Sequence, residues 1–204
     1  MHRIMQKLRG RISSLFSTVI CYLAPEQGES QRHWSKSAVF HIVGCNHGIQ
    51  VGTGGFAALD GVAANEQREH FRAMLSSICA QSGIDSVFEE DGGPEETAGQ
   101  QLAGQLAIPW SDVNTSNDDK QEMGIPQNYV EGDYPAEMKN KWNRQREVFM
   151  GSKIKAQRGN VKTSLVICGF DHLDALADLL GQDGTPVHRY DYRNLPWYQD
   201  GIFT

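Results

Sequence analysis

Two glycine–histidine pairs are the residues of this chain whose types and spacing suggest chemistry. Each pair follows an apolar run: residues 40–47 read FHIVGCNH and residues 166–172 read VICGFDH. A glycine after a buried strand permits a sharp turn, so the histidine three positions later, His47 or His172, lies beyond the carboxyl end of that strand. Open α/β sheets bind their ligands at this edge. The repeated pattern therefore predicts that both histidines line one site.

Three consecutive acids, Glu89, Glu90 and Asp91, follow the apolar run at residues 84–88. Side chains alternate across a strand, so Glu89 and Glu90 should point to opposite faces, and only one of them should reach the site. A carboxylate at a buried strand end is costly unless it is solvated or bound to a cation. The run therefore predicts a carboxylate beside the histidines.

Strand-like and helix-like segments alternate along the chain. Apolar runs predict strands at residues 40–44, 84–88, 108–113, 165–169 and 185–190. Pro109 favours an edge position or a strand start for the third of these, and His41 is expected to be a core residue. Helical periodicity covers residues 65–81, 94–106, 135–157 and 173–180. This order predicts an α/β fold with a mainly parallel central sheet flanked by helices and a site at the carboxyl edge of the strands.

The length of 204 residues suits one domain. Residues 1–36 begin with basic side chains, continue as a short apolar run and then turn polar, which predicts an N-terminal extension or linker. The domain itself should span residues 37–204, with a long loop around residues 114–134. The apolar run is shorter than the roughly 20 residues that a membrane span needs, so we expect a cytoplasmic protein. Secretion or membrane association through residues 1–36 is the alternative.

Composition argues against one class of partner, nucleic acid, and bears on the cellular compartment. The net charge of −6 argues against nucleic acid, because phosphate binding needs concentrated lysine and arginine. The four cysteines show no zinc-finger spacing, which favours free thiols in a reducing compartment. Neither observation decides the oligomeric state, and a homo-oligomer remains open.

Taken together, these motifs resemble the superfamily that groups the Tiki proteases, the TraB pheromone-shutdown proteins, the erythromycin esterases and the ChaN-like haem-binding proteins. The resemblance extends over residues 39–189. The residues that carry it are Gly44, His47, Glu89, Glu90, Asp91, Arg146, Met150, Gly169 and His172. Glu147 departs from the pattern, because asparagine is more usual after the arginine, and residues 114–134 have no counterpart in it.

The resemblance implies a pocket at the sheet edge, lined by the two histidines, at least one carboxylate and Arg146. It favours Glu89 over Glu90 as the carboxylate that faces the site. Tiki-like members are metal-dependent proteases, whereas esterase-like members are thought to use a histidine as general base. The superfamily therefore does not fix one reaction.

We accordingly expect a hydrolase acting on a peptide or on a small-molecule ester. His47, His172 and Glu89 would hold a divalent metal ion, which lowers the pKa of its bound water to about 7. Glu90 or Asp91 would accept the proton of that water, and Arg146 would stabilise the developing oxyanion.

Other interpretations stay open at this point. Without a metal, His47 or His172 can itself be the general base. A non-catalytic metal- or haem-binding protein is the alternative function, and a member that has lost its activity is a third. The residues also have ordinary structural explanations: a histidine at a strand end is often only hydrogen-bonded in a loop, and Arg146 could form an ion pair on a helix surface.

Overall fold

The structure, a computed structural model, describes residues 38–50, 62–90, 96–127, 134–159, 161–195 and 198. Within these ranges five strands form one sheet in the order β3-β2-β4-β1-β5, and every neighbouring pair is parallel. The strands are β1 (Val39–Cys45), β2 (Ser86–Glu89), β3 (Trp110–Asp112), β4 (Thr163–Gly169) and β5 (Val187–Asp191). The predicted α/β fold with a parallel sheet flanked by helices is confirmed.

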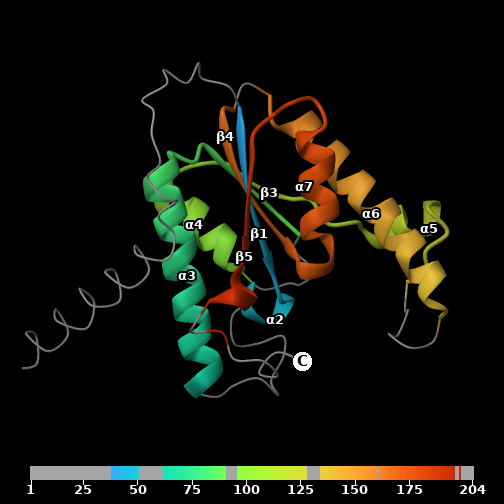
Figure 1. The fold of residues 1–204 in the computed structure, drawn as a ribbon, viewed down its shortest axis with the longest axis horizontal. Coiled ribbons are helices and arrows are strands. Elements are labelled where there is room, and N and C mark those ends of the chain that lie inside the picture. The colour runs from blue at the N-terminus through green and yellow to red at the C-terminus, as the bar shows by residue number, and fades with distance from the viewer. Residues whose placement is uncertain are drawn as a thin grey trace, which may run out of the picture.

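Helices cover both faces of the sheet (Figure 1). On one side lie α3 (Val62–Ser82) and α4 (Ala98–Leu106), and on the other α6 (Ala136–Gln157) and α7 (Leu173–Gly181). Shorter elements follow the carboxyl ends of three strands: α2 (His47–Gln50) after β1, the 3-10 turn η2 (Phe170–His172) after β4 and η3 (Tyr192–Asn194) after β5. The result is a three-layer arrangement.

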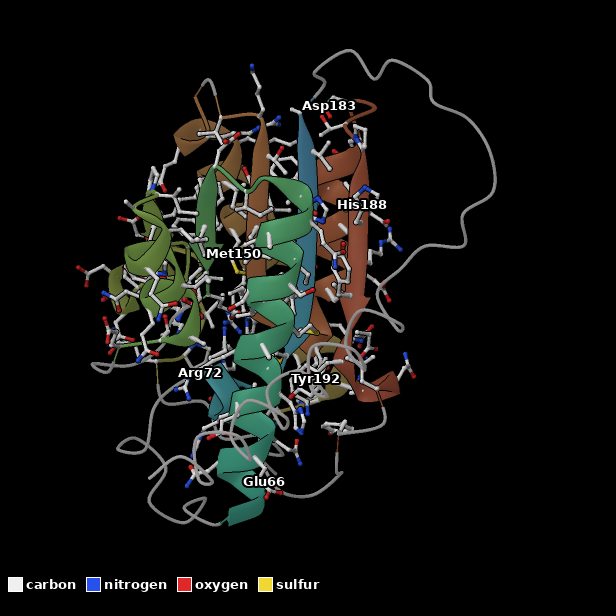
Figure 2. All side chains as sticks on the ribbon, turned by 90° about the vertical axis from the view of Figure 1, so that its left-hand side faces the viewer. Glu66, Arg72, Met150, Asp183, His188 and Tyr192 are labelled. Atoms are coloured by element: carbon white, nitrogen blue, oxygen red, sulfur yellow. The ribbon has the colours of Figure 1, made fainter. Side chains whose placement is uncertain are left out.

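Alternation along the strands divides the apolar side chains between two cores. Phe40 and Ile42 of β1 pack with α6 and α7, whereas Val43 and Cys45 pack with α3 and α4. Figure 2 looks onto the face that α3 covers, with Tyr192 near the carboxyl ends of the strands. A sheet buried on both faces needs apolar residues on both, which explains the continuous runs in the sequence.

The two strands that carry the glycine–histidine motifs are neighbours at the centre of the sheet. β1 pairs with β4 along its whole length, from Val39 opposite Thr163 to Cys45 opposite Gly169. Both strands therefore end at the same level, as we predicted. The prediction for the third strand is confirmed as well, because β3 follows Pro109 and lies at the edge.

One segment differs from the sequence prediction. Residues 114–134, expected to be a long loop, contain a short helix, α5 (Asn117–Glu122). Its start is a capping box: the Ser116 hydroxyl accepts from the backbone of Asp119, and the Asp119 carboxylate accepts from the backbone of Ser116. The capping residues are as polar as loop residues, so composition alone suggested a loop. Residues 128–133 of this segment, and the N-terminal extension at 1–36, lie outside the described residues.

Among the helices that the structure describes, none combines the length and the apolar character needed to cross a bilayer.

Candidate functional site

His47 and His172 face one carboxylate at the carboxyl edge of the sheet. Nε2 of His47 lies 3.9 Å from Oε1 of Glu90, and Nε2 of His172 lies 3.6 Å from the same oxygen. His47 is the first residue of α2, and His172 is the last residue of η2. The two turns and the end of β2 therefore bring three potential acid–base groups together.

Gly169 is the residue that lets these groups approach each other. Its backbone N–H donates to Oε2 of Glu90 at 2.9 Å. A Cβ at this position would lie 3.3 Å from Nε2 of His47 and 3.5 Å from Oε2 of Glu90. The first distance is tighter than an ordinary van der Waals contact, so the glycine of the second motif serves close packing here.

The carboxylate of Glu90 is fully buried and held in its charged form. Burial, the largest single influence, raises its pKa. His172, His47 and Arg146, together with the N–H of Gly169, outweigh that effect and lower the pKa of Glu90 below its ordinary value of 4.5.

Each imidazole is oriented through its other nitrogen. Nδ1 of His47 lies 2.7 Å from Oε1 of Gln50, and Nδ1 of His172 lies 3.1 Å from Oε1 of Glu147. Because both partners are acceptors, we assign the proton of each neutral ring to Nδ1 and the lone pair to Nε2. Both lone pairs then face Glu90.

The two histidines differ in their access to water. The side chain of His47 is 48% exposed, whereas that of His172 is only 5% exposed. His172 lies between two buried carboxylates, Glu90 and Glu147. A substrate or a water molecule arriving from solvent therefore meets His47 first.

Arg146, which the superfamily resemblance placed in the pocket, extends from α6 to Glu90 instead of pairing on the helix surface. Its Nη2 donates to Oε1 of Glu90, and its Nε donates to the hydroxyl of Thr115 at 3.3 Å. A weaker contact joins Nη2 to Oδ1 of Asn114 at 3.5 Å. These contacts hold the guanidinium against the carboxylate, with its side chain 20% exposed.

Glu89, which the superfamily resemblance favoured as the carboxylate beside the histidines, lies elsewhere. Its Oε2 accepts hydrogen bonds from the hydroxyl of Thr97 and from Nε1 of Trp110, the latter at 3.0 Å. Adjacent residues at a strand end point to opposite faces, and it is Glu90 that faces the histidines. Glu89 remains connected to the site through Gln50, whose Nε2 lies 3.5 Å from its Oε1.

The sequence patterns did not identify two of the residues that orient the histidines. Gln50 follows His47 by three positions on a helical turn, a spacing that brings side chains together, but α2 is too short to show periodicity. Glu147 was noted only as a departure from the family pattern, although it is buried beside His172. Asp91, predicted as an alternative proton acceptor, lies outside the described residues.

The predicted divalent ion fits the histidines better than it fits the carboxylate. Two Nε2 lone pairs with acceptors behind each Nδ1 are the usual arrangement of metal-ligating imidazoles. However, Oε1 of Glu90 accepts from the Arg146 guanidinium and Oε2 from the Gly169 N–H. Within the described residues, no three His, Cys, Asp or Glu side chains form a group that could hold an ion. Of the three predicted ligands, His47 and His172 therefore fit an ion, whereas Glu89 is bound by Thr97 and Trp110.

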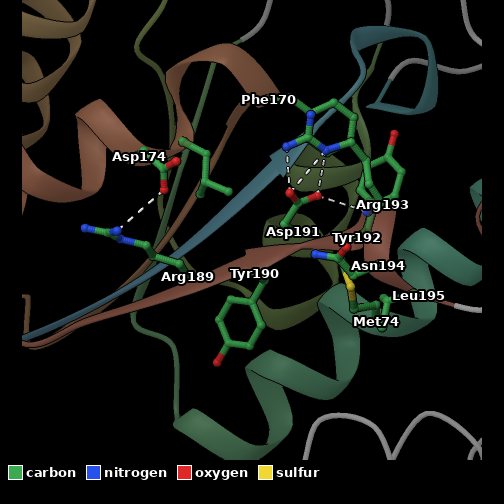
Figure 3. A pocket seen from close by; sticks show the side chains of 11 residues that line it. Met74, Phe170, Asp174, Arg189, Tyr190, Asp191, Tyr192, Arg193, Asn194 and Leu195 are labelled. Carbon is green, nitrogen blue, oxygen red and sulfur yellow. Dashed lines mark hydrogen bonds and ion pairs between the residues drawn. The ribbon is translucent and has the colours of Figure 1, made fainter.

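A separate cavity of about 390 Å³ lies beside β5 and η3 (Figure 3). Asp191 and Arg193 pair in its wall, and the Arg193 guanidinium lies 4.2 Å above the ring of Phe170. Asp174 and Arg189, also in the wall, lie 3.5 Å apart. These charges offset each other, and neither Glu90 nor either site histidine lines the cavity.

Comparison of the chain with protein-family models, with curated proteins and with solved structures found no match in any of the three. The superfamily resemblance therefore stays a prediction that rests on the motifs themselves.

Proposed function

We propose that this protein is a hydrolase that adds water to the carbonyl of an ester or a peptide bond, with His47 as general base. The observation that carries the proposal is the orientation of His47. Its Nδ1 is engaged by Gln50, its Nε2 faces the buried Glu90 carboxylate, and nearly half of the side chain is open to solvent. A general base needs these three features: a free lone pair, a fixed direction and access to water.

In the proposed step, a water molecule lies between His47 and Glu90. A separation of 3.9 Å between Nε2 and Oε1 is too long for a hydrogen bond, but one water can reach both atoms with bonds of about 2.8 Å. The water oxygen forms a bond to the carbonyl carbon while its proton moves to Nε2 of His47. The resulting imidazolium lies beside an ionised carboxylate, which stabilises its charge.

Collapse of the tetrahedral intermediate then breaks the bond to the leaving alcohol or amine. The imidazolium of His47 returns its proton to that leaving group, which restores the starting protonation state. Arg146 has the charge to stabilise the oxyanion, and its Nη1 has no hydrogen-bond partner among the described residues. His172 supports the same carboxylate from the buried side.

The test is turnover of a panel of aryl esters and fluorogenic peptides by the purified protein. Loss of general-base catalysis typically costs about 10²–10⁴ in rate. His47→Ala should lower kcat/KM by that amount with little change in the melting temperature, because the side chain is half exposed. His188→Ala removes an exposed histidine from β5 and should keep full activity (Figure 2). Equal activity of His47→Ala and the unmodified protein would contradict the proposal.

A second candidate is a metal-binding protein without turnover, and the acceptors behind both Nδ1 atoms favour it. If it is correct, elemental analysis should find a stoichiometric divalent ion that is lost in His47→Ala and in His172→Ala. No ester or peptide would then be hydrolysed. Hydrolysis that survives exhaustive chelation would support the histidine-base mechanism and exclude this candidate.

A further inference from the structure

Basic side chains gather on the side of the candidate site where β3 leads into α5. Arg146 contacts Asn114 and Thr115 in this connection, and Nζ of Lys153 donates to the backbone oxygen of Asn114 at 3.4 Å. Lys120 comes from α5 itself. α5 also carries Asp118, Asp119 and Glu122, so it is the placement of these basic side chains, and not the net charge of the segment, that distinguishes this side of the site.

The position of α5 next to Arg146 is set by direct contacts. Nε2 of Gln145, the residue before Arg146, donates to the backbone oxygen of Met123 at 3.3 Å. The turn after α5 closes back onto the helix, because the N–H of Ile125 donates to the backbone oxygen of Lys120 at 2.8 Å. The helix that carries Lys120 is therefore attached to the helix that carries Arg146, as its place beside α6 in Figure 1 also shows.

Lys120 and Arg146 both retain unused hydrogen-bond donors. Lys120 is half-buried, and within the described ranges its ammonium has neither a hydrogen-bond nor an ion-pair partner. Arg146 uses Nε and Nη2 in the contacts above, and its Nη1 has no partner among the residues that the structure describes. A half-buried lysine normally finds an anion, because burial of an unpaired charge is unfavourable.

Electrostatics supports the proximity of these groups. Burial, followed by the charge of Arg146, lowers the pKa of Lys120, and Glu90 acts in the opposite direction. Glu90 is already bound by Arg146 and by the N–H of Gly169, so its charge is shared among several donors. An added anion between Lys120 and Arg146 would relieve the repulsion between them.

We propose that Lys120 and Arg146 form an anion subsite, and that the substrate is a small ester or amide carrying a carboxylate or a phosphate close to the bond that is cleaved. The substrate class in this inference rests on the proposed hydrolase function, whereas the binding of the anion does not depend on it. Nη1 of Arg146 carries two N–H groups, so one can serve the oxyanion of the reacting carbonyl while the other binds the anionic group of the substrate, and Lys120 supplies a second charge. Lys120 acts as a specificity-determining residue.

The binding experiment needs no turnover. Inorganic phosphate and succinate are titrated separately into the full chain, with sodium chloride at matched ionic strength as the reference, and the melting temperature is followed. At least one of the two anions should raise the melting temperature of the unmodified protein and of Lys141→Met, which removes an exposed lysine of α6. The same anion should have at least tenfold weaker affinity for Lys120→Met, the loss expected for one charge-assisted contact. Lys120→Arg should restore most of the binding.

The kinetic experiment compares two aryl esters of similar length, a hemisuccinate with a free carboxylate and a neutral butyrate. The unmodified protein and Lys141→Met should prefer the hemisuccinate by about tenfold or more in kcat/KM. In Lys120→Met the ratio of the two kcat/KM values should fall towards one. The change should appear in the KM for the hemisuccinate.

The outcomes separate the two proposals. Equal affinity of Lys120→Met and Lys141→Met for both anions, or no binding of either anion by the unmodified protein, would overturn the anion subsite whatever the activity. Anion binding that depends on Lys120 without hydrolysis of either ester would support the subsite and count against the hydrolase.

Discussion

At the scale of single residues, the candidate site is a buried carboxylate surrounded by groups that donate or carry positive charge. Glu90 accepts hydrogen bonds from the guanidinium of Arg146 and from the N–H of Gly169, and it faces both imidazoles. Such a carboxylate is stable in the interior only while these partners remain, because an unpaired buried charge is costly. The same partners that orient the site therefore contribute to the stability of the fold.

Glu90→Gln should weaken the fold at neutral pH and flatten its response to acid. The pKa of Glu90 is lowered in the folded state, so on acidification the unfolded chain binds a proton first. The contribution of the ionised Glu90 to the stability of the fold is complete above about pH 4.5. It is lost as the pH falls from there towards the pKa that Glu90 has in the folded state. Denaturant melts should show a loss of about 3 kcal/mol at pH 7 and a shallower decline below pH 4.5.

The control for this prediction is Glu137→Gln, which neutralises an exposed acid in the first turn of α6. It should retain the acid response of the unmodified protein. An unchanged acid response in Glu90→Gln would show that Glu90 is not the group responsible.

His41 should produce a second, separate pH dependence. It is buried, stacks on His188 with ring centres 4.8 Å apart, and bonds to the Tyr190 hydroxyl through Nδ1 at 2.9 Å. Burial, followed by repulsion from His188, lowers its pKa from 6.5 to about 4. The unfolded chain therefore binds the proton first as the pH falls from 6.5 to about 4, and stability is lost across this window.

His41→Phe removes that titration and keeps a ring in the core. The difference in unfolding free energy between pH 7 and pH 4.5 should shrink by on the order of 2 kcal/mol relative to the unmodified protein. Urea melts at several pH values provide the measurement. A pH response as steep as that of the unmodified protein would contradict the assignment to His41.

At the scale of elements, α4 approaches the sheet closely enough to enclose Glu89. Thr97, the N-cap of α4, donates to this carboxylate, and a Cβ at Gly99 would overlap with it. The same Cβ would lie 2.9 Å from Cδ1 of Ile167 in the core. A residue without a side chain is thus required on this face of the helix.

Gly99→Ala and Gly104→Ala, two identical changes in one helix, should have opposite effects. Gly99→Ala should lower the unfolding free energy by about 1–3 kcal/mol, the usual cost of overpacking. Gly104 has open space around its Cβ position, so alanine there should add about 0.5–1 kcal/mol through helix propensity alone. Thermal and urea denaturation of both variants would detect the difference in sign, and destabilisation by both would contradict the packing argument.

At the scale of the whole molecule, the described residues contain a five-stranded sheet and an apolar core on each of its faces. The first strand begins at Val39, the last ends at Asp191, and each face of the sheet has its own pair of helices. Buried apolar area of this kind is the dominant favourable contribution to folding. Residues 1–35 precede all of these elements.

A chain that begins at Lys36 should therefore fold and melt within a few degrees of the full chain. The reason is that the five strands and the four long helices all lie after this point. Circular dichroism and thermal melts of the two chains test the expectation. Failure of the shortened chain to fold would show that residues 1–35 form part of the core.

The sequence by itself determined the fold class and which two turns meet. Short continuous apolar runs that alternate with helical patterns favour the strands of a covered parallel sheet, and the glycines mark where those strands end. Because parallel strands share one carboxyl edge, His47 and His172 could be placed there before any coordinates were known. Helix positions followed from periodicity in the same way, apart from α2, which is too short to show a period, and α5, whose polar residues give no apolar period.

Only the tertiary structure decided which carboxylate serves the histidines and what orients them. Alternation shows that Glu89 and Glu90 diverge, but not which of them faces the histidines, since that depends on how the helices pack on each face of the sheet, as α4 does at Gly99. Glu147 and Arg146 reach the site from a helix far along the chain. Their directions are set by packing between α6 and the sheet, and a pattern of one chain's residues carries no record of such long-range contacts.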